Sequence, residues 1–142
     1  MTAPGGPGAG GVRGIGVDAV DVERFRRVLR RRPTLASRLF TEAELAYAGA
    51  SRDPGPRLAA RFAAKEAVLK ALGVGIGAAG FREVEVTREE GGRPRLELSG
   101  RAATLAARHG VRHWHVSLTH TDTVAVASVV AEGAGTVEGE GA

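Results

Sequence analysis

The apolar residues of this chain change their spacing near Gly73-Val-Gly-Ile-Gly77. After a short predicted strand over Val12–Asp18, they recur three or four residues apart, which is the period of helices packed on a core. Beyond the glycine-rich turn they alternate with polar residues, as strands do, at residues 81–88, 93–98, 113–118 and 123–130. Helices followed by hairpins favour an α+β domain with a mostly antiparallel sheet, whose strand order stays open.

The longest predicted helix spans Arg57–Leu72 and ends at Gly73, the residue type that most often follows a helix. At about 100° per residue its large apolar side chains form one stripe, which is expected to bury this helix at the centre of the domain. They are Leu58, Phe62, Leu69 and Leu72. Shorter helices are predicted at residues 21–31, 41–47 and 99–109, and a loop at residues 51–56.

The chain is predicted to be a single domain, because 142 residues suit one core. Residues 1–11 and 132–142 are rich in glycine and alanine, so we predict disordered tails around a folded part at residues 12–131. The absence of cysteine excludes disulfides and thiolate metal sites. No apolar run approaches the ~20 residues of a membrane span, and the first residues do not resemble a secretory signal, so a cytoplasmic protein is expected.

The two lysines of the chain fall within six residues of each other, whereas the other eighteen basic residues are arginine. Lys65 falls within the apolar stripe of the long helix, and Glu66 and Lys70 lie four residues apart on its edge. A solvated ion pair is the common interpretation of that spacing. Charges at the edge of a core need partners, however, and a metal together with a phosphate would satisfy both signs. We therefore expect the lysine pair to face phosphate.

A second carboxylate is available at Asp18, where the first predicted strand ends. Asp18 has an alternative role as the N-cap of the following helix, although Asp21 can serve as that cap instead. Magnesium is commonly held by one or two carboxylates together with substrate phosphates and water. Asp18 and Glu66 can supply such a pair if the fold brings them together, which no spacing in the sequence decides.

Histidines occur in and just after the strand predicted at His113–Leu118. His120 lies where that strand runs into a turn, and a histidine in a turn is more often exposed than catalytic. His113 and His115 flank Trp114 on one face of the strand. We interpret these two as structural or solvated side chains, and not as a zinc pair.

Several blocks of the sequence resemble the holo-acyl-carrier-protein synthase family, the short type of 4′-phosphopantetheinyl transferase. They are Gly14-Ile-Gly-Val-Asp18 with Val22-Glu-Arg-Phe25, Phe40-Thr-Glu-Ala-Glu-Leu45, and the signature from Arg61-Phe-Ala-Ala-Lys-Glu-Ala67 to Lys70-Ala-Leu-Gly73. Gly92-Arg-Pro-Arg95 and His115–His120 match the remaining blocks. The resemblance covers nearly all of residues 12–130, and the two tails have no counterpart in it.

The resemblance implies transfer of the 4′-phosphopantetheine arm of coenzyme A to a serine of an apo-acyl carrier protein, in fatty-acid or polyketide synthesis. It implies that Asp18 and Glu66 hold Mg²⁺, that Lys70 neutralises phosphate, and that Glu66 or His120 accepts the serine proton. The residues it places in the coenzyme A cleft are Arg61, Lys70, Gly73, Pro94 and His120. The family's short members are homotrimers with that cleft between subunits, so a homotrimer is expected.

Seven arginines lie between residues 24 and 38 with no acidic residue among them. A solvated face, a nucleic-acid surface or a membrane surface would explain such a charge run, but Phe25 is the one aromatic residue near these arginines and it falls on the apolar stripe. Acyl carrier proteins are acidic, so we expect this helix to steer them to the site, and the resemblance makes Arg24 and Arg31 the expected contacts. We predict no nucleic-acid or membrane partner. A nucleic-acid-binding module and a catalytically silent domain of a larger synthase are the two alternative functions.

Overall fold

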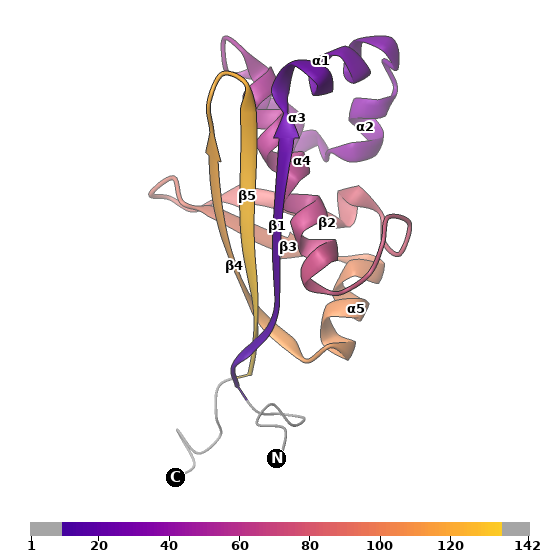
Figure 1. The fold of residues 1–142 in the computed structure, drawn as a ribbon, viewed down its shortest axis with the longest axis vertical. Helices are drawn as coiled ribbons and strands as arrows, with labels where there is room; N and C mark the ends of the chain where they lie inside the picture. Colours follow the sequence, from indigo (N-terminus) through magenta and orange to yellow (C-terminus); the bar gives the residue numbers. More distant parts are fainter. Residues whose placement is uncertain (1–9, 135–142) are drawn as a thin grey trace.

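The computed structural model describes residues 10–134, and Figure 1 shows how their helices and strands are arranged. The helices are α1 (Val22–Arg31), α2 (Leu35–Leu39), α3 (Glu42–Gly49), α4 (Pro54–Ala71) and α5 (Gly100–Arg108), with one 3₁₀ turn, η1 (Phe81–Glu83). The strands are β1 (Val12–Asp21), β2 (Val84–Arg88), β3 (Pro94–Leu98), β4 (Val111–His120) and β5 (Val124–Gly133). The predicted α+β class with antiparallel strands is confirmed.

The strands form two sheets. One has the order β1-β5-β4, and the other is the hairpin of β2 and β3. In the first sheet Asp18 of β1 pairs with Ala127 of β5, which pairs in turn with Leu118 of β4. The predicted end of the first strand at Asp18 is wrong, because β1 continues to Asp21. Asp18 therefore lies within β1, an edge strand of the sheet. The residues before and after it also pair with β5, and this pairing fixes its position.

Helix α4 begins at Pro54, so the loop predicted at residues 51–56 is wrong in its second half. Pro54 and Pro56 are tolerated there because the first turn of a helix needs no intrahelical N–H donors. The Asp53 carboxylate caps this end by accepting a backbone hydrogen bond from the first turn. At the other end Gly73 adopts a positive φ of 71°, which confirms its predicted place just after the helix.

The backbones of β1 and α4 meet at Gly14 and Gly16. A Cβ atom added to Gly16 would lie 1.9 Å from the carbonyl oxygen of Ala67, and one added to Gly14 would lie 2.0 Å from that of Ala71. Glycine is thus required at both positions, because the two backbones approach too closely for any side chain. Because side chains alternate along a strand, Asp18 faces α4 from the same side of β1 as the two glycines.

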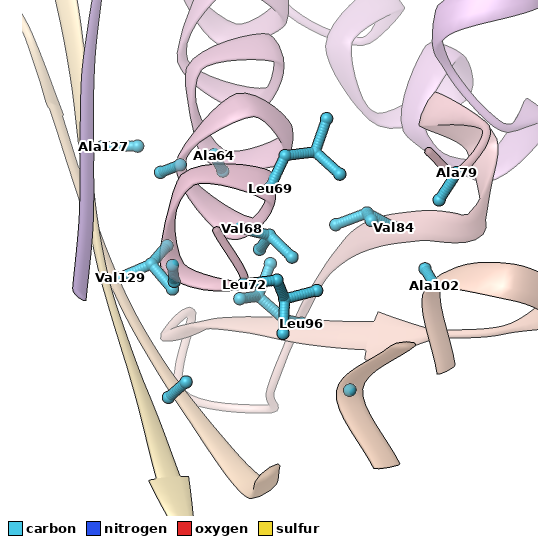
Figure 2. Packing of buried hydrophobic residues seen from close by; sticks show 14 of the residues in the cluster. Ala64, Val68, Leu69, Leu72, Ala79, Val84, Leu96, Ala102, Ala127 and Val129 are labelled. Carbon is cyan, nitrogen blue, oxygen red and sulfur yellow. The ribbon is translucent and has the colours of Figure 1, made fainter. Parts of the chain in front are cut away.

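Helix α4 separates two groups of buried side chains. Figure 2 shows the larger group, in which Val68 and Leu72 lie between Val129 of β5 on one side and Leu96 of β3 on the other. The smaller group joins α4 to α1 and α2. Of the predicted stripe, Leu58, Leu69 and Leu72 are buried and Phe62 is partly buried. The helix is therefore central to the domain, as its stripe predicts.

The cap of α1 is Asp21, whose Oδ2 accepts a hydrogen bond from the backbone N–H of Arg24 at 2.8 Å. The alternative that leaves Asp18 free for another role is therefore the correct one. The helix predicted from residue 41 begins with a capping box, in which Thr41 and Glu44 each accept a backbone hydrogen bond from the other. The elements α2 and η1 were not among the predicted ones, because each is too short to show an apolar period.

The two ends of the described chain are joined by a hydrogen bond from the N–H of Gly133 to the carbonyl of Gly11, at 2.8 Å. Strand β5 accordingly runs two residues past the predicted boundary at residue 131. Most of the two predicted tails, residues 1–9 and 135–142, lies outside the described residues. Within residues 10–134 no helix combines the length and apolar character needed to cross a membrane.

Candidate active site

The fold brings Asp18 of β1 together with Glu66 and Lys70 of α4. Lys70 Nζ donates to Asp18 Oδ1 at 2.9 Å and to the carbonyl oxygen of Val17 at 3.1 Å. The Asp18 side chain is 12% exposed and that of Lys70 is 56% exposed. A nearly buried carboxylate is thus paired with a cation that keeps contact with solvent and that can turn toward a ligand.

Glu66 is partly buried beside Asp18, and the two carboxylates repel each other when both are ionised. Burial first, and then contact with Asp18 and its charge, raise the pKa of Glu66 to about 7, although Lys70 lowers it. Asp18 Oδ2 is buried and accepts no hydrogen bond while Glu66 is ionised, so a proton on Glu66 supplies the donor this oxygen lacks. The two carboxylates, Asp18 and Glu66, are therefore not fully neutralised by Lys70. The hydrogen bond from Lys70 to Asp18 raises the pKa of the Lys70 ammonium group.

A cation shared with a substrate fits this pair of carboxylates. Within residues 10–134 no group of three or more histidine, cysteine, aspartate or glutamate side chains is arranged to enclose a metal ion. Mg²⁺ does not need such a cage, because it commonly takes one or two carboxylates and completes its shell with phosphates and water. The buried Asp18 Oδ2 is an available oxygen ligand of the kind that Mg²⁺ prefers.

Lys65 does not join this site, so the prediction that both lysines face phosphate is wrong. Its side chain is fully buried, and Nζ donates to Glu44 Oε1 at 2.8 Å. Burial lowers the pKa of Lys65, and the carboxylate of Glu44 opposes that change. The position of Lys65 within the apolar stripe of α4 was the signal for this outcome, because a side chain in the stripe points into the core.

A second cluster, which we call the arginine pocket, consists of three guanidinium groups around the ring of Tyr47. The Cζ atoms of Arg61, Arg57 and Arg88 lie 4.3, 4.8 and 5.2 Å from the ring centre. Together with Leu118, Thr119 and His120 they line a cavity of about 380 Å³. The structure thus brings Arg61 and His120, two of the predicted coenzyme A contacts, to one cavity.

The arginine pocket carries uncompensated positive charge. Arg61 is 2% exposed and its Nε has no hydrogen-bond partner. Burial and the charge of Arg88 lower the pKa of Arg61, whereas Tyr47 and Glu44 raise it. Within residues 10–134 none of the three arginines forms an ion pair with a carboxylate. Clustered guanidinium groups are well suited to binding phosphate oxygens in pairs.

Sequence reasoning missed Tyr47, Arg57 and Arg88 as members of this pocket. They come from α3, α4 and β2, so no spacing along the chain relates all three. The four-residue interval between Arg57 and Arg61 on one helix face was the available signal.

The arginine pocket and the carboxylates do not meet within one chain. Arg61 and Glu66 lie about 140° apart around α4, given 100° per residue. Strand β5 separates Asp18 of β1 from His120 of β4. Pro94 lines a different groove of about 900 Å³ between β3 and β4. The predicted site residues therefore fall into separate parts of the chain's fold.

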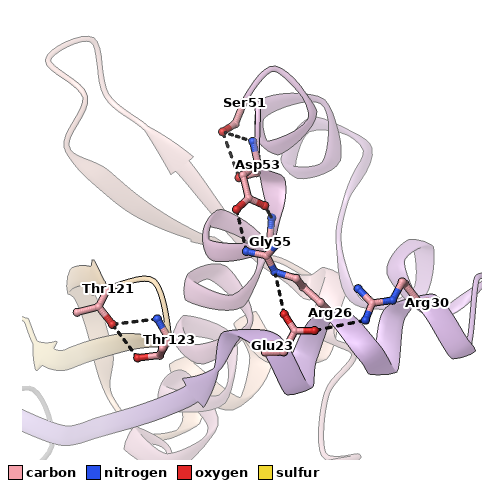
Figure 3. Close-up of polar contacts among 8 residues, drawn as sticks. All are labelled: Glu23, Arg26, Arg30, Ser51, Asp53, Gly55, Thr121 and Thr123. Atoms are coloured by element: carbon pink, nitrogen blue, oxygen red, sulfur yellow. Dashed lines mark hydrogen bonds and ion pairs between the residues drawn. The ribbon is translucent and has the colours of Figure 1, made fainter.

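The basic helix α1 contains both paired and unpaired arginines. Arg26 forms an ion pair with Asp53 at 2.8 Å, and Arg30 forms one with Glu23 at 3.3 Å (Figure 3). Within the described residues Arg24 and Arg31, which are exposed, have no such carboxylate partner. The two arginines predicted to contact a partner are thus among those whose charge is available to one.

Relatives of known activity resemble this chain over almost their whole length. The holo-[acyl-carrier-protein] synthase of Moorella thermoacetica is 48% identical over 124 residues, which cover 87% of this chain and 97% of that protein. The synthase of Streptomyces coelicolor is 52% identical over 120 residues, covering 84% of this chain and 97% of that protein.

Solved structures show the same fold. The holo-[acyl-carrier-protein] synthase of Neisseria meningitidis matches with a TM-score of 0.78 and 32% identity, covering 85% of this chain and 98% of that one. The Bacillus anthracis synthase, in complex with CoA (3′,5′-ADP), matches with a TM-score of 0.72 and 32% identity, covering 87% of this chain and 98% of that one. The family model for the 4′-phosphopantetheinyl transferase superfamily matches residues 14–129. Taken with the geometry above, these matches show that the chain belongs to the 4′-phosphopantetheinyl transferase superfamily.

Proposed function

We propose that the chain is a holo-[acyl-carrier-protein] synthase, which transfers the 4′-phosphopantetheine arm of coenzyme A to a serine of an apo-acyl carrier protein. The observation that carries this function is the meeting of Asp18, Glu66 and Lys70 between β1 and α4. Two carboxylates and an ammonium group suit a reaction that needs both a cation and a phosphate. The relatives that are about half identical over most of the chain support the same activity.

The reaction exchanges one bond to phosphorus for another. The serine oxygen bonds to the phosphorus that carries the pantetheine arm, and the bond from that phosphorus to the adenosine 3′,5′-bisphosphate leaving group breaks. The serine proton passes to Glu66 or to His120. Lys70 neutralises charge on the phosphate oxygens as a compact ammonium group, so catalysis is mainly positioning and electrostatic stabilisation.

Mg²⁺ fits this site as the cation, and Asp18 and Glu66 are the residues that would hold it. When bound, it would neutralise the pyrophosphate of coenzyme A as a Lewis acid. Glu66 then has less capacity as a base, and His120 is the alternative proton acceptor.

Thermal unfolding tests the metal assignment without turnover. The raised pKa of Glu66 stabilises the metal-free protein below about pH 4.5, and this contribution is lost as pH rises through about 7. Mg²⁺ replaces that proton, so it should raise Tm more at pH 8.5 than at pH 5.5. With Mg²⁺ at about ten times its Kd the gain is about 1.4 kcal/mol, or roughly 4 °C. Asp18→Asn should lose the shift, and an equal shift at both pH values would contradict the assignment.

The arginine pocket fits the 3′-phosphate of the adenosine part of coenzyme A. Its guanidinium groups supply paired donors, and His120 at the end of β4 adds a ring nitrogen. Gly73 and Pro94 remain proposed contacts of the coenzyme A cleft on the family resemblance. Because the pocket and the carboxylates lie on different faces of one chain, a complete site requires the pocket of one subunit beside the carboxylates of another.

Self-association as a homotrimer would assemble such a site. The face of the β1-β5-β4 sheet turned away from α4 exposes apolar side chains, with Ile15 67% and Val17 57% exposed. Val126 and Val130 of β5 share that face and are partly buried. An apolar sheet face of this kind is suited to contact with further copies of the chain.

Helix α1 is the proposed docking surface for the acidic carrier protein. Arg24→Ala should raise the KM for the carrier by roughly threefold to tenfold at low salt and leave the KM for coenzyme A unchanged, because a rim charge mainly affects association. Arg101→Ala, on the exposed face of α5, is the matched control and should change neither. A raised KM for coenzyme A alone would move Arg24 to the nucleotide site.

Mass spectrometry provides the direct test of the activity. Purified protein is incubated with several apo-acyl carrier proteins, coenzyme A and Mg²⁺, and a gain in carrier mass equal to one phosphopantetheine is expected. The absence of that gain on every carrier would overturn the proposed function.

A further inference from the structure

A buried ion pair lies close to the arginine pocket, within one helical turn of Tyr47 on α3 and of Arg61 on α4. The side chains of Glu44 and Lys65 are both 0% exposed, with Lys65 Nζ 2.8 Å from Glu44 Oε1. Lys65 Nζ also donates to the carbonyl oxygens of Phe81, at 2.9 Å, and of Val84. All three donors of the ammonium group are therefore used, and they tie α4 to η1 and to the start of β2.

Glu44 makes the matching connections from α3. Its Oε1 also accepts from the backbone N–H of Thr41 at 3.0 Å, and its Oε2 accepts from the backbone N–H of Val86 at 2.8 Å. One carboxylate thus holds the start of its own helix and the middle of β2. Together with Lys65 it connects α3, α4, η1 and β2 through directional hydrogen bonds, with little freedom for any one of them to shift alone.

Stability alone gives a weak reason for this pair. Taking two charges out of water is costly, and well-packed apolar residues often serve a core as well or better. Burial accordingly lowers the pKa of Lys65. The pair is better explained by a requirement for geometry, since hydrogen bonds fix direction and apolar contacts do not.

Three of the connected elements, α3, α4 and β2, also contribute residues to the arginine pocket, whose remaining wall comes from β4. In each of them one residue of the buried network lies on the same face of the helix or strand as one residue of the pocket. The pairs are Glu44 and Tyr47 on α3, Lys65 and Arg61 on α4, and Val86 and Arg88 on β2.

We propose that Glu44 and Lys65 are positioning residues that hold Tyr47, Arg61 and Arg88 in register, and thereby set the selection for a 3′-phosphate on the adenosine ligand. This inference rests on the proposed function of the pocket. The pair does not touch the ligand. It acts by fixing where three elements present their cationic and aromatic groups.

The double variant Glu44→Gln/Lys65→Met tests the proposal. Glutamine keeps the size of the side chain but has a single acceptor oxygen, which can serve the N–H of Thr41 or that of Val86 and not both, and methionine fills the space of the lysine stem. Calorimetry measures the Kd of adenosine 3′,5′-bisphosphate and of adenosine 5′-monophosphate. The wild type should prefer the bisphosphate by roughly 10-fold to 100-fold, as charge-assisted hydrogen bonds to one phosphate provide. In the variant the ratio of the two Kd values should fall by at least about tenfold. Its Kd for the monophosphate should stay within about threefold of the wild-type value.

The matched control is Val129→Ala, which removes buried volume from β5 away from the junction of α3, α4 and β2. It should lower the unfolding midpoint and keep the preference for the bisphosphate. A double variant that keeps the wild-type preference, or that weakens both ligands equally, would overturn the positioning role. If the double variant does not fold, Lys65→Met alone, which leaves both acceptor oxygens of Glu44 in place, is measured against the same criteria. A wild type without any preference would overturn the pocket assignment itself, and with it this inference.

Discussion

Replacement of Glu66 by glutamine is expected to lower turnover on the order of 10³-fold or more, and to leave the protein folded. Glutamine keeps the size of the side chain and removes its negative charge. The site would lose one of its two proposed metal ligands and one candidate for the proton acceptor. The repulsion from Asp18, which together with burial raises the pKa of Glu66 to about 7, would disappear as well.

Loss of activity with undiminished stability is the expected signature of Glu66→Gln. At pH 8.5 and without Mg²⁺, its unfolding midpoint should equal or exceed that of the wild type, because an ionised Glu66 destabilises the folded state there. Light scattering should give the same molar mass as for the wild type. Glu97→Gln, on the exposed side of β3, is the matched control and should remain active. Retained turnover in Glu66→Gln would remove both proposed roles of this residue.

Gly16→Ala is expected to destabilise the fold by about 3 kcal/mol or more. The added methyl group would lie 1.9 Å from the carbonyl oxygen of Ala67, so β1 must move away from α4. Asp18, two residues along β1, would move with it and separate from Glu66. The variant should therefore lose the stabilising effect of Mg²⁺ even under conditions in which it remains folded.

Urea unfolding measures this effect, and Gly49→Ala provides its control. Gly49 lies on α3, has no atom within 4 Å of an added Cβ, and keeps a negative φ. Alanine there should be neutral or stabilising, because it favours helix. Equal unfolding midpoints for Gly16→Ala and the wild type would show that the contact between β1 and α4 can open without cost.

Features that depend on neighbours along the chain were predictable. The capping box of Thr41 and Glu44, the glycine that follows α4, and the apolar stripe of that helix all follow from local spacing. The boundaries that were wrong have local explanations too. Pro54 and Pro56 suggested a loop, because proline breaks a helix interior and yet is accepted in its first turn.

Features that depend on contacts between distant segments were not predictable. The residue type of Lys65 suggested phosphate, and its position in the stripe suggested burial; its partner Glu44 lies 21 residues away. The arginine pocket combines α3, α4 and β2, which no period connects. No spacing in the sequence decided whether Asp18 meets Glu66, and the structure places Asp18 beside Glu66 and in contact with Lys70, 52 residues away.

At the contact between β1 and α4, a substitution of either glycine cannot be compensated by a second substitution elsewhere in the interface. A Cβ on Gly14 or Gly16 would meet main-chain oxygen atoms, which every residue type carries, so no second-site suppressor on the facing side of α4 could make room for it. Glycine is the smallest residue, so β1 already presents the least possible side-chain volume to α4 at these two positions. Random mutagenesis followed by selection for function should therefore leave both glycines unchanged. In redesign, the spacing between β1 and α4, and with it the placement of Asp18 beside Glu66, should be treated as fixed.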